Sequence, residues 1–303
     1  MKQLLSITLF LLFAFATLHS VGQVTPKQDE KVSMTYVVNE TDTILVNTDT
    51  LLVYTDTVSV YTDTVLVCTD TVPVVFFGNY AQPNSSADAV LLAHTAFTIS
   101  YVEKYGNPEW VAYRLTKPEQ EITIKRYSGN FKVDPKFSNC ATHADYTNSG
   151  YDRGHIFPAA NAWTEEIMKE SFFTTNITPQ LHPFNAGIWL RMEEKEREWA
   201  KLYDTLYVVS GTVLTDGLPV IGKKTDVAVP EYFFKVFLVN TVQEQKAIAF
   251  YVSGDKGYDS KPQEFAISVD SLQKITGFDF CIELDAATQL KVEQELDLDK
   301  WKW

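Results

Sequence analysis

The 303-residue sequence has little cysteine and a deficit of positive charge. Its three cysteines, Cys68, Cys140 and Cys281, are too few for a dense disulfide scaffold. Lys and Arg total 26 against 39 Asp and Glu, which gives a formal net charge of −13. A sequence-independent nucleic-acid binder normally has a basic surface, so this balance alone argues against one. The sequence also lacks a serine nucleophile elbow, a nucleotide-binding loop and a Cys-x-x-Cys pair, which removes the commonest motif-based functions.

Long apolar runs are also scarce, and the clearest one lies at the N-terminus. Met1-Lys2 precedes the apolar stretch 4–18, which is followed by the small residues Ser20 and Gly22. A membrane-spanning helix needs about 20 apolar residues, so this pattern favours a secretory signal peptide over residues 1–22. We therefore expect an exported protein (periplasmic, cell-envelope or secreted) with no stable membrane span after signal removal. In an exported protein Cys140 and Cys281 either pair or remain small core residues, and the sequence leaves both open.

A short repeat separates this segment from the rest of the chain. From Thr41 to about Val74, Thr-Asp-Thr recurs every seven residues, with Asp42, Asp49, Asp56, Asp63 and Asp70 marking the period. Thr, Val and Asp are poor helix formers, and an odd period cannot keep one face of a flat strand. We therefore interpret residues 23–75 as a linker or stalk of short strand-like pieces or extended chain. It is either a tolerated low-complexity spacer or a self-associating segment.

Residues 76–303 have the pattern of a globular domain. β-branched or alternating runs predict strands, and apolar periodicity predicts two helices. Strands outnumber helices and do not alternate regularly with them, which indicates an α+β fold with a mainly antiparallel sheet core. The predicted strands are 110–115, 121–126, 206–213, 232–239 and 246–252, and the predicted helices are 165–173 and 185–203.

Two segments of this domain concentrate residues suited to catalysis. The first is Tyr151-Asp152-Arg153-Gly154-His155, in which the glycine is expected to permit a tight turn before the histidine. Taken alone, His155 could equally be a hydrogen-bonded loop residue.

The second segment runs from Asn176-Ile-Thr-Pro-Gln into a predicted helix that starts near Asn185. On that helix Asn185, Trp189 and Glu193 stand at i, i+4 and i+8 and share one face. An amide oxygen with a carboxylate two turns along suits a hydrated hard cation. A capping Asn and a surface Glu are the simpler interpretation of either residue by itself.

Together the two segments resemble the DNA/RNA non-specific endonuclease family, the ββα-metal nucleases of the Serratia nuclease and endonuclease G type. Asp-Arg-Gly-His at 152–155 matches the family signature. Asn176-Ile-Thr-Pro-Gln, Asn185-x-Gly-x-Trp-x-x-x-Glu193 and Arg197 match its second block in the same order. The resemblance covers roughly residues 78–277. It implies a ββα-metal (His-Me finger) site in residues 76–303.

The resemblance also implies catalytic and metal-binding roles. His155 corresponds to the general base that takes a proton from the attacking water, and an unperturbed imidazole pKa of about 6.5 suits that role. Asn185 corresponds to the single protein ligand of Mg²⁺, with Mn²⁺ as the alternative, and waters complete the shell. Glu193 corresponds to the acid that orients one of those waters.

The remaining predicted site residues are four arginines and one aspartate. Arg126 resembles the arginine that grips the scissile phosphate, and Arg153 belongs to the catalytic set through the signature motif. Arg191, Arg197 and Asp152 are assigned to substrate binding. Arg153 and Asp152 are also suited to fixing the turn before the histidine.

These assignments predict an exported, Mg²⁺-dependent, sugar-non-specific endonuclease that acts on DNA and RNA. The alternative is a cell-envelope structural or adhesive protein whose nuclease-like domain only binds. The sequence does not indicate an oligomeric state. Much of the negative charge lies outside the predicted site, since residues 24–78 carry eight acids against two lysines, and residues 283–300 carry six against two. We therefore expect modest, metal-dependent and salt-sensitive substrate binding.

Overall fold

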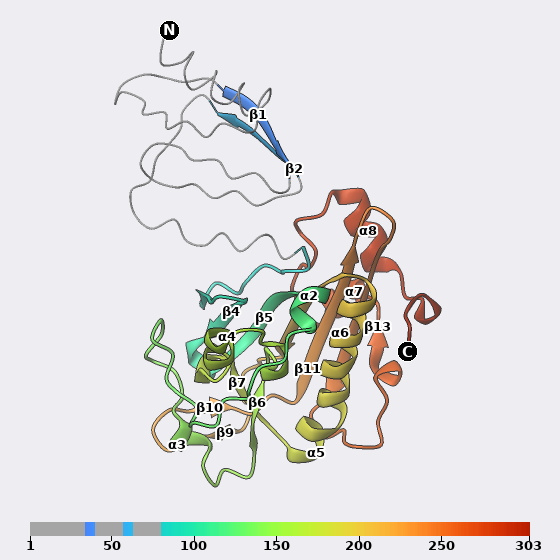
Figure 1. The fold of residues 1–303 in the computed structure, drawn as a ribbon. Helices are drawn as coiled ribbons and strands as arrows, with labels where there is room; N and C mark the ends of the chain where they lie inside the picture. Colours follow the sequence, from blue (N-terminus) through green and yellow to red (C-terminus); the bar gives the residue numbers. More distant parts are fainter. Residues whose placement is uncertain (1–33, 40–56, 63–79) are drawn as a thin grey trace, which may run out of the picture. The chain divides into compact units, whose positions relative to one another are not determined.

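The computed structural model describes residues 34–39, 57–62 and 80–303 (Figure 1). The chain divides into two units, residues 1–75 and 76–303, and each is described by itself. In the first unit β1 (Met34–Asn39) pairs antiparallel with β2 (Thr57–Thr62), which lies within the Thr-Asp-Thr repeat. The predicted signal peptide and most of the repeat lie outside the described residues. None of the helices in the described residues is long and apolar enough to cross a membrane.

The second unit is built on a seven-stranded sheet in the order β13-β12-β11-β8-β5-β4-β3, in which every neighbouring pair is antiparallel. This confirms the predicted α+β fold with a mainly antiparallel sheet. The sheet strands are β3 (Ala89–Ala93), β4 (Phe97–Val102), β5 (Asn107–Thr116), β8 (Thr205–Thr212), β11 (Tyr232–Asn240), β12 (Gln245–Ser253) and β13 (Ala266–Ile267).

Two short strand pairs and several helices complete the unit. The pairs are β6 (Asp152–His155) with β7 (Ile177–Gln180), and β9 (Val220–Ile221) with β10 (Val227–Ala228). The α-helices are α2 (Lys117–Gln120), α3 (His143–Tyr146), α4 (Glu165–Glu170), α5 (His182–Phe184), α6 (Leu190–Leu202), α7 (Val269–Thr276) and α8 (Ala286–Gln294). Short 3₁₀ turns are η1 (Glu103–Tyr105), η2 (Ala159–Asn161), η3 (Thr174–Asn176), η5 (Pro262–Phe265) and η6 (Leu298–Lys300), and η4 (Asn185–Trp189) is a π-helical turn.

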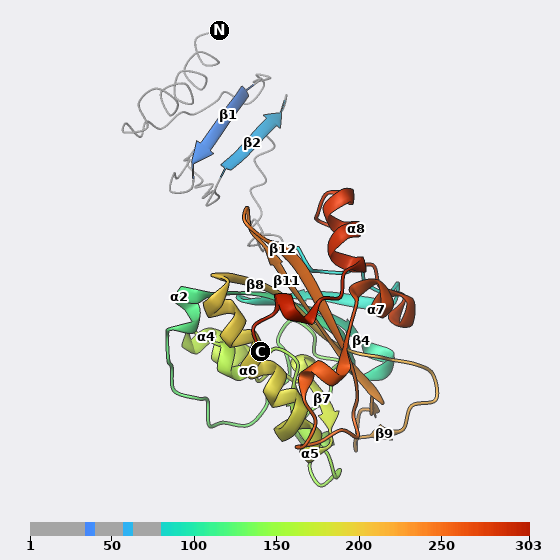
Figure 2. The same cartoon turned by 90° about the vertical axis from the view of Figure 1, so that its right-hand side faces the viewer.

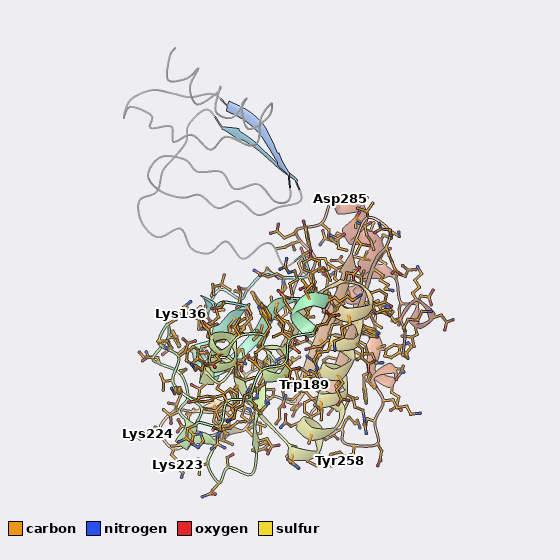
Figure 3. The ribbon with its side chains drawn as sticks, viewed as in Figure 1. Lys136, Trp189, Lys223, Lys224, Tyr258 and Asp285 are labelled. Carbon is orange, nitrogen blue, oxygen red and sulfur yellow. The ribbon has the colours of Figure 1, made fainter. Side chains whose placement is uncertain are left out.

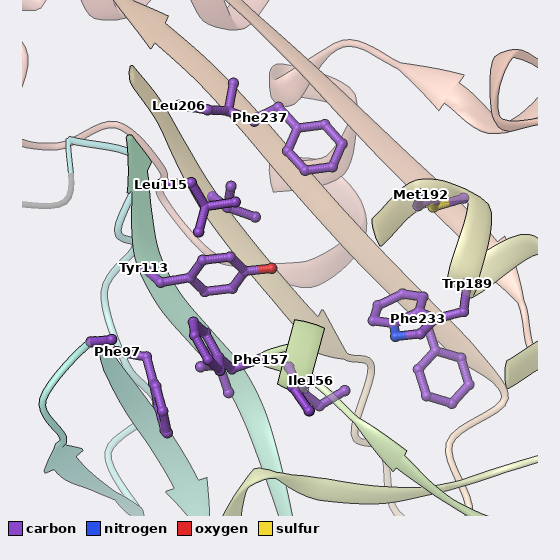
Figure 4. Close-up of a cluster of buried hydrophobic side chains, with 14 of the residues drawn as sticks. Phe97, Tyr113, Leu115, Ile156, Phe157, Trp189, Met192, Leu206, Phe233 and Phe237 are labelled. Atoms are coloured by element: carbon purple, nitrogen blue, oxygen red, sulfur yellow. The ribbon is translucent and has the colours of Figure 1, made fainter. Parts of the chain in front are cut away.

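The side chains of each central strand alternate between two cores, one on each face of the sheet. In β11, Phe233, Phe237 and Val239 join the core beneath α4 and α6, whereas Phe234 and Val236 join the core beneath α7 and α8. This alternation is the period of two that a pleated strand imposes. Figure 2 shows α4 and α6 on one side of the sheet and α7 and α8 on the other. Figure 4 shows part of the first core, where side chains of the sheet meet Trp189 and Met192.

The predicted strand at 121–126 is wrong. Strand β5 ends at Thr116, which is also the N-cap of helix α2 and forms a capping box with Glu119; Pro118 lies in the first turn of that helix. The following residues form a loop in which Ile122 is exposed and Ile124 packs on the core. The apolar alternation was present, but no neighbouring strand is available to pair with this segment. The other four predicted strands correspond to β5, β8, β11 and β12, with ends that differ by at most three residues.

The two predicted helices are found with different boundaries. The first, α4, begins where Thr164 accepts a hydrogen bond from the Ile167 N–H and ends at Glu170, shorter than predicted. The second spans η4 and α6, but its first turn is π-helical. Cys140 and Cys281 are both buried and unpaired, so the alternative of small core residues holds.

Candidate active site

A ββα unit brings the two predicted segments together on the α6 side of the sheet. Strand β6 pairs antiparallel with β7, with Gly154 opposite Thr178 and His155 opposite Ile177. From β7 the chain passes through α5 and η4 into α6. Gly154 lies inside the strand and not in a tight turn, which corrects the sequence interpretation. A Cβ at this position would lie 2.1 Å from Oε1 of Gln180, so the glycine makes room for that side chain.

His155 lies between two aromatic side chains at the end of β6. Its ring centroid is 5.4 Å from that of Phe131 and 4.9 Å from that of Phe172, and its Nε2 is buried with no hydrogen-bond partner among the described residues. Burial, helped by the nearby positive charge of Arg126, lowers the pKa of His155 to about 3. The imidazole is therefore neutral at physiological pH, with an unpaired nitrogen available for a proton or a water. A phosphate anion beside it would raise this pKa, because a negative charge favours the imidazolium.

A hydrogen bond from Trp189 fixes the backbone of His155. The indole Nε1 of Trp189 donates to the backbone carbonyl of His155 at 3.0 Å, and Trp189 is fully buried. Trp189 lies between Asn185 and Glu193 in the i, i+4, i+8 series, yet its side chain belongs to the hydrophobic core. Its hydrogen bond joins β6, which carries His155, to the segment formed by η4 and α6.

Asn185 is oriented by a carboxylate from β6. Its Nδ2 donates to Oδ2 of Asp152 at 2.9 Å, and Nδ1 of His182 lies 2.8 Å from the same oxygen. The amide oxygen of Asn185 is thereby fixed on the opposite side of its side chain, where it can serve as a ligand. Asp152 thus contacts the predicted metal ligand. A carboxylate repels phosphate, so this arrangement suits orienting Asn185 better than the substrate binding predicted for Asp152.

Glu193 lies one turn into α6 and is half-buried. Burial, with Glu196 adding to it, raises its pKa to about 7, although Lys235, Arg197 and Arg126 act in the opposite direction. Arg126 thus influences both Glu193 and His155, which brings these three predicted residues into one electrostatic group.

The four predicted arginines differ in their surroundings. Arg126 is exposed, and its guanidinium lies 5.3 Å from the ring centroid of Phe172, next to His155. Arg197 lies on α6, donates to Oδ1 of Asn161 at 3.3 Å and acts on Glu193. Both can therefore reach an anion at the site.

Arg153 and Arg191 are instead held by hydrogen bonds to other parts of the protein. Nη2 of Arg153 donates to the carbonyl of His143 at 2.9 Å and to Oγ1 of Thr147 at 2.8 Å. Nη1 of Arg191 donates to the carbonyl of Ser260 at 2.6 Å. The bonds of Arg153 hold α3 against β6, and the bond of Arg191 holds the loop after β12 against α6.

The π-helical turn η4 packs directly against that loop. Gly187 has the non-helical dihedrals φ −108°, ψ −107°, and a Cβ there would lie 2.9 Å from the carbonyl carbon of Gly257 and 3.0 Å from the nitrogen of Tyr258. Figure 3 shows Tyr258 near the start of the helix that carries Trp189. A π turn in an otherwise α-helical segment is frequent at functional sites. Here the turn begins at Asn185 and leads into the α-helix that carries Glu193.

A fully buried ion pair lies beneath α6 and was not anticipated from the sequence. Nζ of Lys235 lies 2.9 Å from Oε2 of Glu196 and donates to Oγ of Ser210 at 2.8 Å, and both charged side chains are 0% exposed. The Glu196 carboxylate also accepts from Tyr113 Oη at 3.0 Å and Asn161 Nδ2 at 2.6 Å. A lysine in the middle of the apolar strand 232–240 was the sequence signal that could have revealed this network.

The donor chemistry of the site fits a hydrated hard cation. The amide of Asn185 and the carboxylates of Asp152 and Glu193 offer oxygen ligands, which Mg²⁺ prefers. The described residues contain no group of three or more His, Cys, Asp or Glu that could hold a metal. A cation that keeps most of its waters needs only one or two protein oxygens, so Asn185 would hold it with Asp152 and Glu193 acting through water.

Comparison with known proteins supports the resemblance drawn from the motifs. Nuclease EXOG, mitochondrial, of Danio rerio is 32% identical over 219 residues, covering 67% of this chain and 63% of the relative, so the chain spans less than two thirds of that protein. Endonuclease G, mitochondrial, of Bos taurus is 28% identical over 217 residues, covering 67% and 73%. A solved structure of an EndoG/EndoGI complex superimposes with a TM-score of 0.62 at 25% identity, covering 68% of this chain and 90% of that one.

The sequence model of the DNA/RNA non-specific endonucleases matches residues 78–287. This span contains the ββα unit and every predicted site residue. The chain therefore belongs to the DNA/RNA non-specific endonuclease family.

Proposed function

We propose that this chain is an exported, metal-dependent endonuclease that hydrolyses phosphodiester bonds of DNA and RNA. The observation that carries this proposal is the buried Nε2 of His155, which has no partner among the described residues and lies beside the exposed Arg126. Asn185 in η4 and Glu193 in α6 belong to the same ββα unit. A neutral base, a cationic phosphate ligand and hard oxygen donors are the groups that phosphodiester hydrolysis needs.

Each residue has one task in this mechanism. His155 removes a proton from a water that attacks phosphorus, and the nearby phosphate anion strengthens the imidazole as a base. Arg126 neutralises the charge that develops on the phosphate oxygens, with Arg197 as a second cation. Asn185, held by Asp152, would bind Mg²⁺ (or Mn²⁺), which when present supplies Lewis-acid stabilisation of the phosphate and leaving oxygen. Glu193 accepts hydrogen bonds from water on that side of the site.

Export is supported by the N-terminal pattern and not by the relatives, since both curated relatives described above are named as mitochondrial. Mitochondrial transit peptides are amphipathic and Arg-rich. Residues 1–22 contain no Arg and carry a single Lys before the predominantly apolar stretch 4–18. We therefore propose a periplasmic, cell-envelope or released enzyme.

Cleavage assays test the proposal. The purified chain should cut plasmid DNA and RNA in Mg²⁺, and EDTA should abolish both activities. His155→Ala should lower the rate by about 10²- to 10⁴-fold while circular dichroism remains unchanged, since general-base catalysis contributes about that much. Cleavage that withstands EDTA or His155→Ala would contradict the mechanism. Binding without cleavage by the intact chain would instead favour the structural or adhesive alternative.

A further inference from the structure

A hollow of about 380 Å³ lies beside the candidate active site. It is formed by residues 124–128, the loop after α2, and by the side of α4. Lys125, Arg126 and Tyr127 line it from the loop, and Met168 and Lys169 line it from the helix. The volume falls within the range of about 300–1,000 Å³ that is usual for small-molecule sites, so one nucleotide can fit.

Arg126 connects this hollow to the catalytic group. Its guanidinium lies over the ring of Phe172, and that ring packs on His155 at 4.9 Å between centroids. The ring of Tyr127 packs edge-on against Phe172 at 5.2 Å, from within the hollow. A strand whose scissile phosphate lies at Arg126 would therefore extend directly into the hollow.

The lining combines positive charge with an apolar floor. Lys125, Arg126 and Lys169 face one acid, Glu165. That acid is 3.6 Å from Lys169, but both side chains are more than half exposed, and such a surface pair is weak. Met168 is 5% exposed, and Nζ of Lys132 lies 5.7 Å from the ring of Tyr127, which adds a further cation. A positive rim beside an aromatic ring is the usual platform for one nucleotide of a strand.

We propose that this hollow binds the nucleotide adjacent to the scissile phosphate, with its own phosphate at Lys125 and Lys169 and its sugar and base against Tyr127 and Met168. The proposal rests on the proposed endonuclease function and adds a subsite to it. Phosphate contacts position a substrate without reading its sequence. The subsite therefore favours polynucleotides over small phosphodiesters.

The test compares two variants that lose the same charge. The double variant Lys125→Gln/Lys169→Gln removes both lysines from the lining of the hollow. Lys274→Gln/Lys291→Gln removes two exposed lysines from α7 and α8, and Lys274 pairs with Asp270 at i,i+4 as Lys169 pairs with Glu165. Cleavage of a 20-nucleotide single strand and of bis(p-nitrophenyl) phosphate is measured for each variant, with KM for the strand followed across salt concentration.

For the hollow variant we expect KM for the strand to rise roughly five- to tenfold, and the salt slope to fall by about one per lysine. The ratio of strand cleavage to small-diester cleavage should fall in parallel, and the control variant should keep the wild-type ratio. Equal behaviour of the two variants would overturn the subsite. A parallel loss on both substrates would do the same, because it places the lysines in the chemical step. An intact chain that cleaves neither substrate would contradict the proposed function itself, a result separate from these two.

Discussion

The two faces of the central sheet are built on different principles. The face under α4 and α6 buries charge, with Lys235 and Glu196 fully buried and Glu193 half-buried beside them. The face under α7 and α8 is packed by apolar residues such as Phe234, Val236 and Leu238. Both faces come from the same strands, since alternate residues of β11 serve each. The face under α7 and α8 also holds a buried acid, Glu293, but the fully buried ion pair and the candidate site both lie on the face under α4 and α6.

The largest difference between the faces should appear when the buried ion pair is broken. Lys235→Met leaves the Glu196 carboxylate buried without its cation, which should cost about 3–5 kcal/mol of unfolding free energy. Urea denaturation measures the loss. Leu238→Met, on the other face of the same strand, keeps its volume and should cost less than about 1.5 kcal/mol. Adding Glu196→Leu to Lys235→Met should recover part of the loss, and equal costs for Lys235→Met and Leu238→Met would remove the distinction.

Glu193→Gln should change the free energy of unfolding by a smaller amount and in the stabilising direction. The pKa of Glu193 is raised to about 7 in the folded chain, so the folded state favours the protonated carboxyl, and stability is lost as pH rises from about 4.5 to 7. The amide variant avoids this loss. Without metal it should exceed the wild type by up to about 3 kcal/mol at pH 8, with the gap closing toward pH 5. Thermal unfolding in EDTA measures the gap.

The same variant should have lost its cleavage activity, so stability and activity separate at this position. Glu293→Gln is the matched control, because Glu293 is a buried carboxylate on α8 whose pKa is also raised by burial. It should keep wild-type cleavage. A Glu193→Gln variant that is active, or less stable than the wild type at pH 8, would contradict the role assigned to Glu193.

The smallest expected effect concerns helix capping. Oγ of Ser268 accepts from the Ser271 N–H at the start of α7, and Oγ1 of Thr164 accepts from the Ile167 N–H at the start of α4. Replacing either by Ala should cost about 1 kcal/mol. Ser268→Ala should leave KM for a 20-nucleotide strand unchanged, whereas Thr164→Ala should raise it, since α4 carries Lys169. An increase of equal size in both variants would weaken the functional division of the faces.

Motif order and spacing pointed to His155, Asn185 and Glu193, and the structure places all three in one ββα unit. Their catalytic and metal-binding roles stay predictions. Local spacing did not reveal that Arg191 bonds to the carbonyl of Ser260, because that residue belongs to a loop far along the chain. The assignment of Arg191 to substrate binding was made without this contact. The strand expected at 121–126 failed for a related reason, because pairing needs a partner that local alternation cannot specify.

Strand β4 was missed although its pattern could have revealed it, since residues 97–102 (Phe-Thr-Ile-Ser-Tyr-Val) alternate apolar and polar side chains. Other features depend on tertiary burial, which a local pattern does not specify. The pKa of His155 shifts far from the value of free imidazole because Phe131 and Phe172 exclude water from it. Neither aromatic residue is adjacent to His155 in the sequence.

The contact of Gly187 with the backbone at Gly257 and Tyr258 has an evolutionary consequence. Surface loops usually accept insertions and varied residues. This loop packs against the turn that begins at Asn185. A change in the length of the loop should therefore be accompanied by a change in the size of residue 187. We expect the two segments to co-vary among related sequences. In engineering, the loop after β12 is then the place from which the position of a metal ligand can be adjusted without replacing it.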